Sequence, residues 1–209
     1  MTAAGAFFED TWVIVNEGVY EPAEDTFLLC AHLDIRPDEN FLEVGTGCGL
    51  VAVVAAKVGA KVVATDQSLL AVQNAQENIS LHNLNDLIEI RQGSYFEPIK
   101  PDEKFTLIAF NPPYLPSTEE DRAFDPAWSG GATGRKVSDI FLAQAPGYLE
   151  KNGRLLLIHS SLANPEETQV HLQQLFHDVH IKAEKPLFFE RLILFEAKNP
   201  VKTSKAKKI

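Results

Sequence analysis

Residues 41–66 read FLEVGTGCGLVAVVAAKVGAKVVATD, and this stretch decides the fold. Residues 41–44 form a short apolar run that ends at a glycine, which is typical of a buried strand. Residues 50–58 are small and apolar, as in a helix that packs on a sheet, and residues 61–65 return to a strand pattern. Two strands joined through a helix lie parallel in one sheet. The stretch therefore predicts an α/β fold.

The rest of the chain continues this alternation. Strand patterns recur at residues 87–91, 105–110, 154–159, 179–184 and 191–196. Helix patterns cover residues 68–82, 137–149 and 165–176, with Ser68 as the expected N-cap, Pro165 in a first turn and Pro146 late enough to kink its helix. Because no helix separates the last two strands, they must pair as an antiparallel hairpin. We expect a doubly wound, mostly parallel sheet of seven strands with an antiparallel last strand.

The composition is that of an ordinary globular protein of 209 residues, with 45% hydrophobic and 23% charged residues. No apolar run approaches the roughly 18–20 residues that span a bilayer, and residues 1–10 lack the basic region of a signal peptide. Cys30 and Cys48 have no CxxC spacing, which argues against a disulfide scaffold or an internal zinc site and favours the cytoplasm. We expect an N-terminal extension at residues 1–18, one main domain at 19–198 and a disordered basic tail at 199–209.

The charge distribution bears on the substrate. The chain carries 29 acidic and 19 basic residues, for a net charge of −10, and four of the lysines lie in residues 202–209. The acidic body repels phosphate backbones, because like charges raise the free energy of association. This charge argues against duplex DNA as the substrate.

A glycine-rich turn follows the first strand of the unit. Gly45, Gly47 and Gly49 let the backbone turn tightly and approach a ligand. Asp66 ends the next strand, 21 residues after Gly45, where an acid can accept hydrogen bonds from ribose hydroxyls. The spacing is GxGxG rather than the GxGxxG of dinucleotide sites, and there is no P-loop motif, so a nucleoside without a pyrophosphate fits better. A merely tight strand-to-helix turn is the alternative.

The tetrapeptide Asn111-Pro112-Pro113-Tyr114 directly follows the strand pattern 105–110. The two prolines cannot continue a central strand, and they hold Asn111 in extended geometry at the carboxyl end of that strand, where doubly wound sheets bind ligands. The Asn111 side-chain oxygen and the Pro112 carbonyl can accept both N–H bonds of a planar nitrogen, and Tyr114 can stack on its plane. An ordinary turn with an aromatic lid is the alternative.

The motifs EVGTGCG, VVATD and NPPY, in this order, resemble the class I methyltransferases of the HemK/PrmC type, the release-factor glutamine methyltransferases. The segments VYEPAEDTF at residues 19–27 and AWSGGATGR at residues 127–135 are similar to those of the eukaryotic and archaeal branch. NPPY alone is shared with adenine methyltransferases. The resemblance covers residues 19–197 and implies a Rossmann-like class I methyltransferase domain.

The resemblance also implies the ligands and their contacts. S-adenosyl-L-methionine, which becomes S-adenosyl-L-homocysteine, would be held by Thr26, Glu43, Gly45, Thr46, Gly47, Gly49, Asp66, Ser94, Tyr95 and Asn111. The acceptor glutamine of the Gly-Gly-Gln loop in a class I peptide release factor would be held by Asn111, Pro112, Pro113 and Tyr114, of which Asn111, Pro112 and Tyr114 are the expected catalytic residues. Members of this branch act with a small zinc-binding activator protein, and no metal is expected in this chain.

Ser94 departs from the family pattern, which has an acid at this position to bond the adenine amine. We expect weaker cofactor binding, or help from the Tyr95 backbone.

Two other functions remain open at this level. The same nitrogen-binding tetrapeptide could serve adenine in nucleic acid or a protein lysine, and a non-catalytic cofactor-binding scaffold is an alternative of another class. A base-flipping enzyme usually carries a separate recognition region, for which this chain has no room. A lysine ammonium must lose a proton and offers no planar face to Tyr114.

Overall fold

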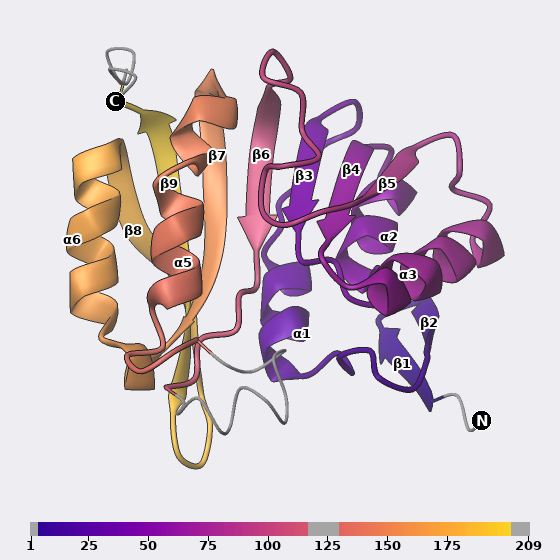
Figure 1. The fold of residues 1–209 in the computed structure, drawn as a ribbon, viewed down its shortest axis with the longest axis horizontal. Helices are drawn as coiled ribbons and strands as arrows, with labels where there is room; N and C mark the ends of the chain where they lie inside the picture. Colours follow the sequence, from indigo (N-terminus) through magenta and orange to yellow (C-terminus); the bar gives the residue numbers. More distant parts are fainter. Residues whose placement is uncertain (1–3, 117–129, 202–209) are drawn as a thin grey trace.

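The computed structural model describes residues 4–116 and 130–201. Its centre is a seven-stranded sheet in the order β5-β4-β3-β6-β7-β9-β8 (Figure 1). The strands are β3 (Asn40–Val44), β4 (Lys61–Asp66), β5 (Ile88–Gln92), β6 (Phe105–Phe110), β7 (Leu149–Ser160), β8 (Phe176–Pro186) and β9 (Arg191–Pro200). The pairs from β5 to β7 are parallel, whereas β9 runs antiparallel to both β7 and β8. The predicted doubly wound sheet with an antiparallel last strand is confirmed.

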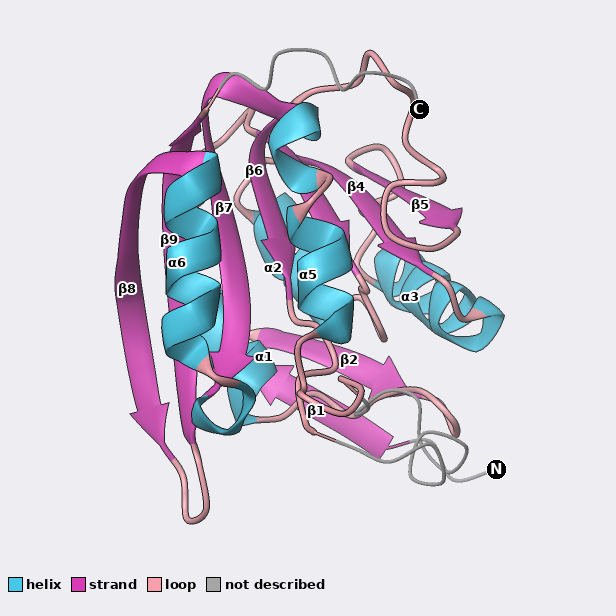
Figure 2. Cartoon of the chain, turned by 60° about the vertical axis from the view of Figure 1, so that its left-hand side comes forward, coloured by secondary structure: helices cyan, strands magenta, loops and turns pink. Residues whose placement is uncertain are grey.

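Helices cover both faces of the sheet. The helices are α1 (Glu24–Ala31), α2 (Leu50–Lys57), α3 (Leu69–Leu81), α5 (Lys136–Leu142) and α6 (Pro165–Leu175). Successive side chains of β3 point to opposite faces, so that Phe41 packs with residues of α1, α2 and α3, and Leu42 packs with residues of α5 and α6. Figure 2 shows α5 and α6 side by side on one face. Among the described residues, no helix is long and apolar enough to cross a membrane.

Two helix caps follow the sequence prediction. The Ser68 hydroxyl accepts a hydrogen bond from the Ala71 amide at 3.4 Å, as expected of an N-cap. Pro165 occupies the first turn of α6, and the Asn164 side chain caps that helix. These local rules hold because each depends only on groups within one turn.

The helix expected at residues 137–149 is wrong in its second half. Helix α5 ends at Leu142, a short 3-10 turn η1 spans Ala145–Tyr148, and β7 begins at Leu149. Pro146 lacks an amide hydrogen, and its ring clashes with the carbonyl four residues back, so an α-helix cannot continue through it. The proline ends the helix rather than kinking it.

A small hairpin at the start of the chain was not predicted. Strands β1 (Ala4–Phe8) and β2 (Thr11–Val15) pair with each other and pack beside α2 and α3. The fully buried Asn78 of α3 donates to the Ile14 carbonyl at 2.7 Å and accepts from the Ile14 amide at 2.8 Å. This amide pairing ties the hairpin to the helix that follows β4.

Candidate active site

A cavity of about 710 Å³ opens at the carboxyl ends of β3, β4 and β6. Strand β3 is the point at which the strand order reverses, since β4 lies on one side of it and β6 on the other. Ligands of doubly wound sheets bind at such a switch point. The cavity is lined by residues from the segments 18–26, 43–51, 66–71, 93–95 and 110–114 and by Val137. Every predicted site residue except Gly49 is among them.

The glycine turn gives the cavity one wall. Gly47 has φ +56°, and a Cβ added there would meet no atom within 4 Å, so its side faces open space where a ligand can approach. Gly49 has φ +86° and lies against α3 instead, where a Cβ would come within 3.0 Å of the Ala75 Cβ. Gly49 thus permits helix packing and does not face the cavity.

Two carboxylates line the same wall, that of Glu43 buried and that of Asp66 half-buried. Glu43 is 4% exposed and accepts a hydrogen bond from the Thr46 hydroxyl at 2.7 Å. Burial, with a smaller contribution from the charge of Asp66, raises the pKa of Glu43 to about 8. Asp66 accepts from the amides of Gly47 at 3.0 Å and Ser68 at 2.9 Å, and burial also raises its pKa. Neither carboxylate has an ion pair among the described residues. This wall suits a ligand with a positive charge and hydroxyl groups.

The Asn111 side chain has an unused acceptor. Its Nδ2 lies 3.5 Å from the Thr26 hydroxyl, at the limit of a hydrogen bond. Its Oδ1 is buried and has no hydrogen-bond partner within the described part of the chain. A buried acceptor without a partner costs about 1–3 kcal/mol, so this oxygen is poised to accept an N–H bond from a ligand in the cavity. The neighbouring Pro112 and Pro113 also line the cavity.

Asp25 fixes the tyrosine of the tetrapeptide. Its carboxylate is 4% exposed and accepts hydrogen bonds from the Tyr114 hydroxyl at 3.0 Å, the Tyr20 hydroxyl at 2.8 Å and the Thr26 amide at 2.6 Å. Burial, together with the nearby carboxylate, raises the pKa of both tyrosines far above the usual range, so they remain donors. Sequence reasoning selected Thr26 from the YEPAEDTF segment and missed Asp25 beside it. The stacking role of Tyr114 stays a prediction.

Ser94 and Tyr95 lie in the turn after β5 and line the cavity. The Ser94 amide donates to the Glu97 carboxylate at 3.0 Å, and Tyr95 has φ +50°, an uncommon conformation for a residue with a side chain. The turn is held close to β4, because the Gly93 amide donates to the Asp66 carbonyl at 2.9 Å. A ligand bound to Asp66 would therefore extend toward Ser94.

Residues 130–135 support the tetrapeptide from behind; Ala127–Ser129 of the quoted segment lie outside the described residues. A Cβ on Gly134 would come within 2.3 Å of the Tyr114 carbonyl oxygen, so only glycine fits. Arg135, 4% exposed, donates to the Asn164 carbonyl at 3.2 Å, to Asp139 at 2.8 Å and to the Thr168 hydroxyl. This buried arginine anchors the chain that returns beside Tyr114.

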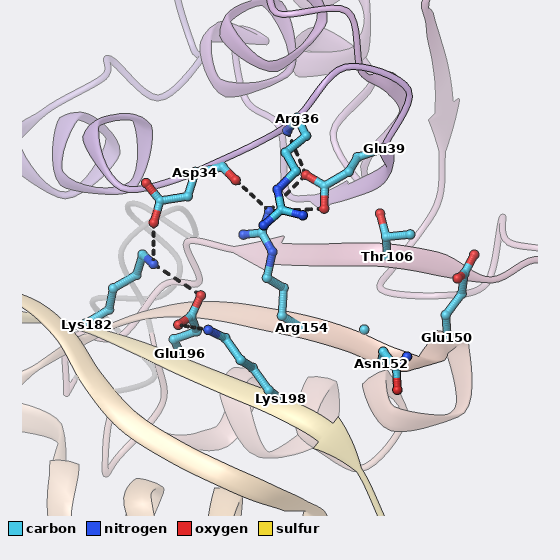
Figure 3. A pocket seen from close by; sticks show the side chains of 11 residues that line it. Asp34, Arg36, Glu39, Thr106, Glu150, Asn152, Arg154, Lys182, Glu196 and Lys198 are labelled. Atoms are coloured by element: carbon cyan, nitrogen blue, oxygen red, sulfur yellow. Dashed lines mark hydrogen bonds and ion pairs between the residues drawn. The ribbon is translucent and has the colours of Figure 1, made fainter.

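A second cavity, of about 410 Å³, lies at the opposite, amino-terminal ends of the central strands. It is lined by Asp34, Arg36, Glu39, Thr106, Glu150, Asn152, Gly153, Arg154, Lys182, Glu196 and Lys198 (Figure 3). Arg154 pairs with Glu39 at 3.0 Å, and Lys182 pairs with Asp34 at 2.7 Å and Glu196 at 3.2 Å. In these ion pairs each charged side chain has an oppositely charged partner within the protein. The pairs join the loop before β3 to β7, β8 and β9. The first cavity is therefore the better candidate site.

No group of three or more histidine, cysteine, aspartate or glutamate side chains that could hold a metal ion occurs among the described residues. What the first cavity offers is a carboxylate wall, an acceptor without a partner and a tyrosine held by a buried carboxylate.

Comparison with known proteins adds the family. The family described as Methyltransferase small domain matches residues 12–189. A protein of Methanocaldococcus jannaschii named as a protein N5-glutamine methyltransferase is 39% identical over 183 residues, which cover 86% of this chain and 91% of that protein. The Methyltransferase HEMK2 of Mus musculus is 34% identical over 160 residues, or 71% of this chain and 75% of the relative.

Among solved structures, a chain of the E. cuniculi Mtq2–Trm112 complex superimposes with a TM-score of 0.67 and 23% identity, covering 87% of this chain and 98% of that one. At this identity the likeness shows a shared fold. The sequence relatives and the matched family go further: this chain belongs to the Methyltransferase small domain family and is an S-adenosyl-L-methionine-dependent methyltransferase.

Proposed function

We propose that this enzyme methylates the side-chain amide nitrogen of a glutamine, the one in the Gly-Gly-Gln loop of a class I peptide release factor. The observation that carries the proposal is the buried Asn111 Oδ1 without a partner, at the carboxyl end of β6. A planar amide offers two N–H donors, which this oxygen and the Pro112 carbonyl can accept together. The names of relatives support the acceptor: the archaeal relative is named for protein N5-glutamine, and the Mtq2–Trm112 complex for methylation of the termination factor eRF1.

The residues of the chain would act mainly by positioning. Bound S-adenosyl-L-methionine supplies an electrophilic methyl group on a sulfonium, and its thioether product leaves uncharged. Glu43 and Asp66 would hold the cationic, ribose-bearing cofactor along their wall. Asn111 and Pro112 would fix the amide so that its nitrogen faces the methyl group, which removes the entropy cost of orienting two reactants. Asp25 would hold Tyr114 in place beside the amide.

We propose a small protein partner for this chain as well, of the zinc-binding activator type. The support is the E. cuniculi chain, which is described in complex with Trm112. A substrate that takes part in translation also makes the cytoplasm the expected location.

Methyl transfer to a purified class I release factor tests the proposal, with the activator both present and absent. Asn111→Ala should lower kcat by about 10²–10³-fold, because the side-chain oxygen that orients the substrate amide is lost. The cofactor Kd from calorimetry should stay within about threefold. A release factor whose loop glutamine is changed to alanine is the matched substrate control.

Two results would contradict the proposal. One is equal methylation of the glutamine-free release factor. The other is transfer by the wild type to an adenine-containing oligonucleotide or a protein lysine, with none to the release factor.

A further inference from the structure

The turn between β8 and β9 exposes two phenylalanines that the core does not use. Phe188 is 92% exposed and Phe189 is 84% exposed, more than any other large apolar side chain in the described part of the molecule. Their rings contact each other edge to face, with centroids 4.6 Å apart. Exposed aromatic side chains that lie together mark interaction sites more often than isolated apolar residues do.

The turn lies at the same edge of the sheet as the active site. Leu157 of β7 pairs with Phe110, the last residue of β6, and also with Phe195 of β9. Because β9 runs antiparallel to β7, the start of β9 lies at the carboxyl ends of β6 and β7. The Phe188–Phe189 turn comes just before β9, so it lies at the same end of the sheet as the tetrapeptide that follows Phe110. Figures 1 and 2 both show this hairpin projecting past the carboxyl edge of the sheet, below α1.

The base of the hairpin contacts residues next to those that line the cavity. Lys185 forms an ion pair with Glu24, the residue before Asp25 in α1. Glu190 accepts a hydrogen bond from the Ser160 hydroxyl at the end of β7. The negative charge of Glu190 also contributes to the raised pKa of Tyr114 and Tyr20. Leu187 packs against the core cluster that contains Tyr114, and its amide donates to the Glu190 carbonyl at 2.8 Å. The base of the turn thus packs beside residues that line the cavity, and the two rings lie at its exposed tip.

The surface around the turn suits a folded protein. Aromatic rings on a rigid turn lose little conformational entropy when they bind, and they fill apolar pockets of a partner. A lipid surface or a nucleic acid is a poorer match, because both are anionic and the chain has a net charge of −10.

We propose that Phe188 and Phe189 form a docking surface for the acceptor protein. The two rings contact an apolar patch on the folded part of the acceptor protein while its loop with the reacting glutamine enters the cavity. This inference rests on the proposed function and adds to it a second contact, remote from the chemistry. Such a contact selects intact release factor over a short peptide of the same loop sequence.

The test is a comparison of kcat/KM on intact release factor and on a short Gly-Gly-Gln peptide. The double variant Phe188→Ala/Phe189→Ala should lose about tenfold or more on the intact protein, as expected when aromatic anchors are removed. Its kcat/KM on the peptide and its cofactor Kd should stay within about twofold of the wild type. Phe188→Leu/Phe189→Leu should recover part of the loss. Phe7→Ala, which removes a 66% exposed ring on β1, is the matched control and should change neither substrate.

The outcomes separate this proposal from the proposed function. No wild-type turnover of release factor or peptide would overturn both. Turnover by the wild type with an unchanged double variant would overturn the docking surface alone, as would an equal loss on protein and peptide. Two further results for the double variant would also overturn it, if kcat/KM on the intact protein is not selectively lowered. They are a changed oligomeric mass on size exclusion and a loss of binding to phosphatidylserine vesicles.

Discussion

The two cavities lie at opposite ends of the same strands, and they differ in whether their polar side chains are paired with other groups of the protein. At the amino ends, Arg154, Lys182 and Lys198 each pair with a carboxylate of the protein (Figure 3). At the carboxyl ends, Glu43 and Asp66 have no cationic partner among the described residues, and Asn111 Oδ1 has no partner at all there. Buried polar groups without a partner lower the stability of the fold, and a bound ligand can supply the missing partner. The difference separates a structural charge network from a binding site.

The largest effect on cofactor binding is expected from filling the ligand side of the glycine turn. Gly47→Ala places a methyl group in the open cavity at a backbone conformation that disfavours it, and it should weaken cofactor binding by about 10²-fold, since a displaced ligand loses several contacts together. Equilibrium dialysis of labelled cofactor measures this. Gly147→Ala is the control, because a Cβ there also meets no atom within 4 Å but lies outside the cavity. Equal Kd values for the two variants would contradict the assignment of the cavity.

Asp25→Asn tests whether the buried carboxylate acts through Tyr114. An amide cannot accept hydrogen bonds from both tyrosine hydroxyls and the Thr26 amide as a carboxylate does, so Tyr114 should lose its fixed position. We expect kcat to fall about 10- to 100-fold, with a smaller change in cofactor Kd. Tyr20→Phe, which removes one bond and leaves Tyr114 held, should cost less. A Tyr20→Phe variant as impaired as Asp25→Asn would argue that the network is only structural.

The pH dependence of cofactor binding distinguishes an unpaired acid from a paired one. The folded-state pKa of Glu43 is raised to about 8 from an ordinary value of 4.5, so ionisation in the empty site is unfavourable. Its contribution to stability is therefore fully present below pH 4.5 and is lost as the pH rises to about 8. A cationic cofactor favours the ionised carboxylate, so its affinity should rise by up to about tenfold per pH unit below pH 8 and then level off.

Calorimetric titrations between pH 6 and pH 9 measure this dependence. Glu43→Gln should flatten the profile, because the glutamine does not titrate. A wild-type profile as flat as that of the variant would show that the cofactor does not meet this carboxylate.

The smallest effect on activity is expected at the second cavity. Glu196 is 2% exposed and contacts Lys182 at 3.2 Å and Lys198 at 2.8 Å. Glu196→Gln removes the carboxylate that pairs with Lys198 and leaves Lys182 with Asp34 alone. The change should lower the free energy of unfolding by about 1–3 kcal/mol, as urea denaturation would report. The value of kcat should stay within about twofold. Loss of activity with unchanged stability would reverse our distinction between the cavities.

The succession of strands and helices along the chain could be predicted because each element depends on a local pattern. Apolar runs punctuated by glycine and proline predict the strands from β3 to β9, and the absence of a helix between the last two predicts their hairpin. The same local logic placed Ser68 and Pro165 at helix starts. It failed at Pro146, where the pattern predicts a kinked helix but the α-helix ends before the proline.

The candidate site was predicted in part. Asn111 could be predicted because the two prolines that follow it restrict its backbone. Asp66 could be predicted because it ends the strand that follows the glycine turn. Asp25 and Arg135 were not recognised as supports, since their partners lie far along the chain: Tyr114 is 89 residues from Asp25, and Thr168 is 33 residues from Arg135. Nothing in the local pattern of either residue records such a partner.

By itself, the sequence determined the alternation of strands and helices, the glycine turn with its acid and the rigid tetrapeptide at a strand end, because these follow from backbone sterics and short-range periodicity. Only the tertiary structure decided that Gly49 packs against α3 and does not line the cavity, that Asp25 holds Tyr114, and that Asn111 Oδ1 remains without a protein partner in the described residues. The physical reason is that burial and hydrogen-bond satisfaction depend on which distant segments meet, and that is settled when the sheet and its helices pack together.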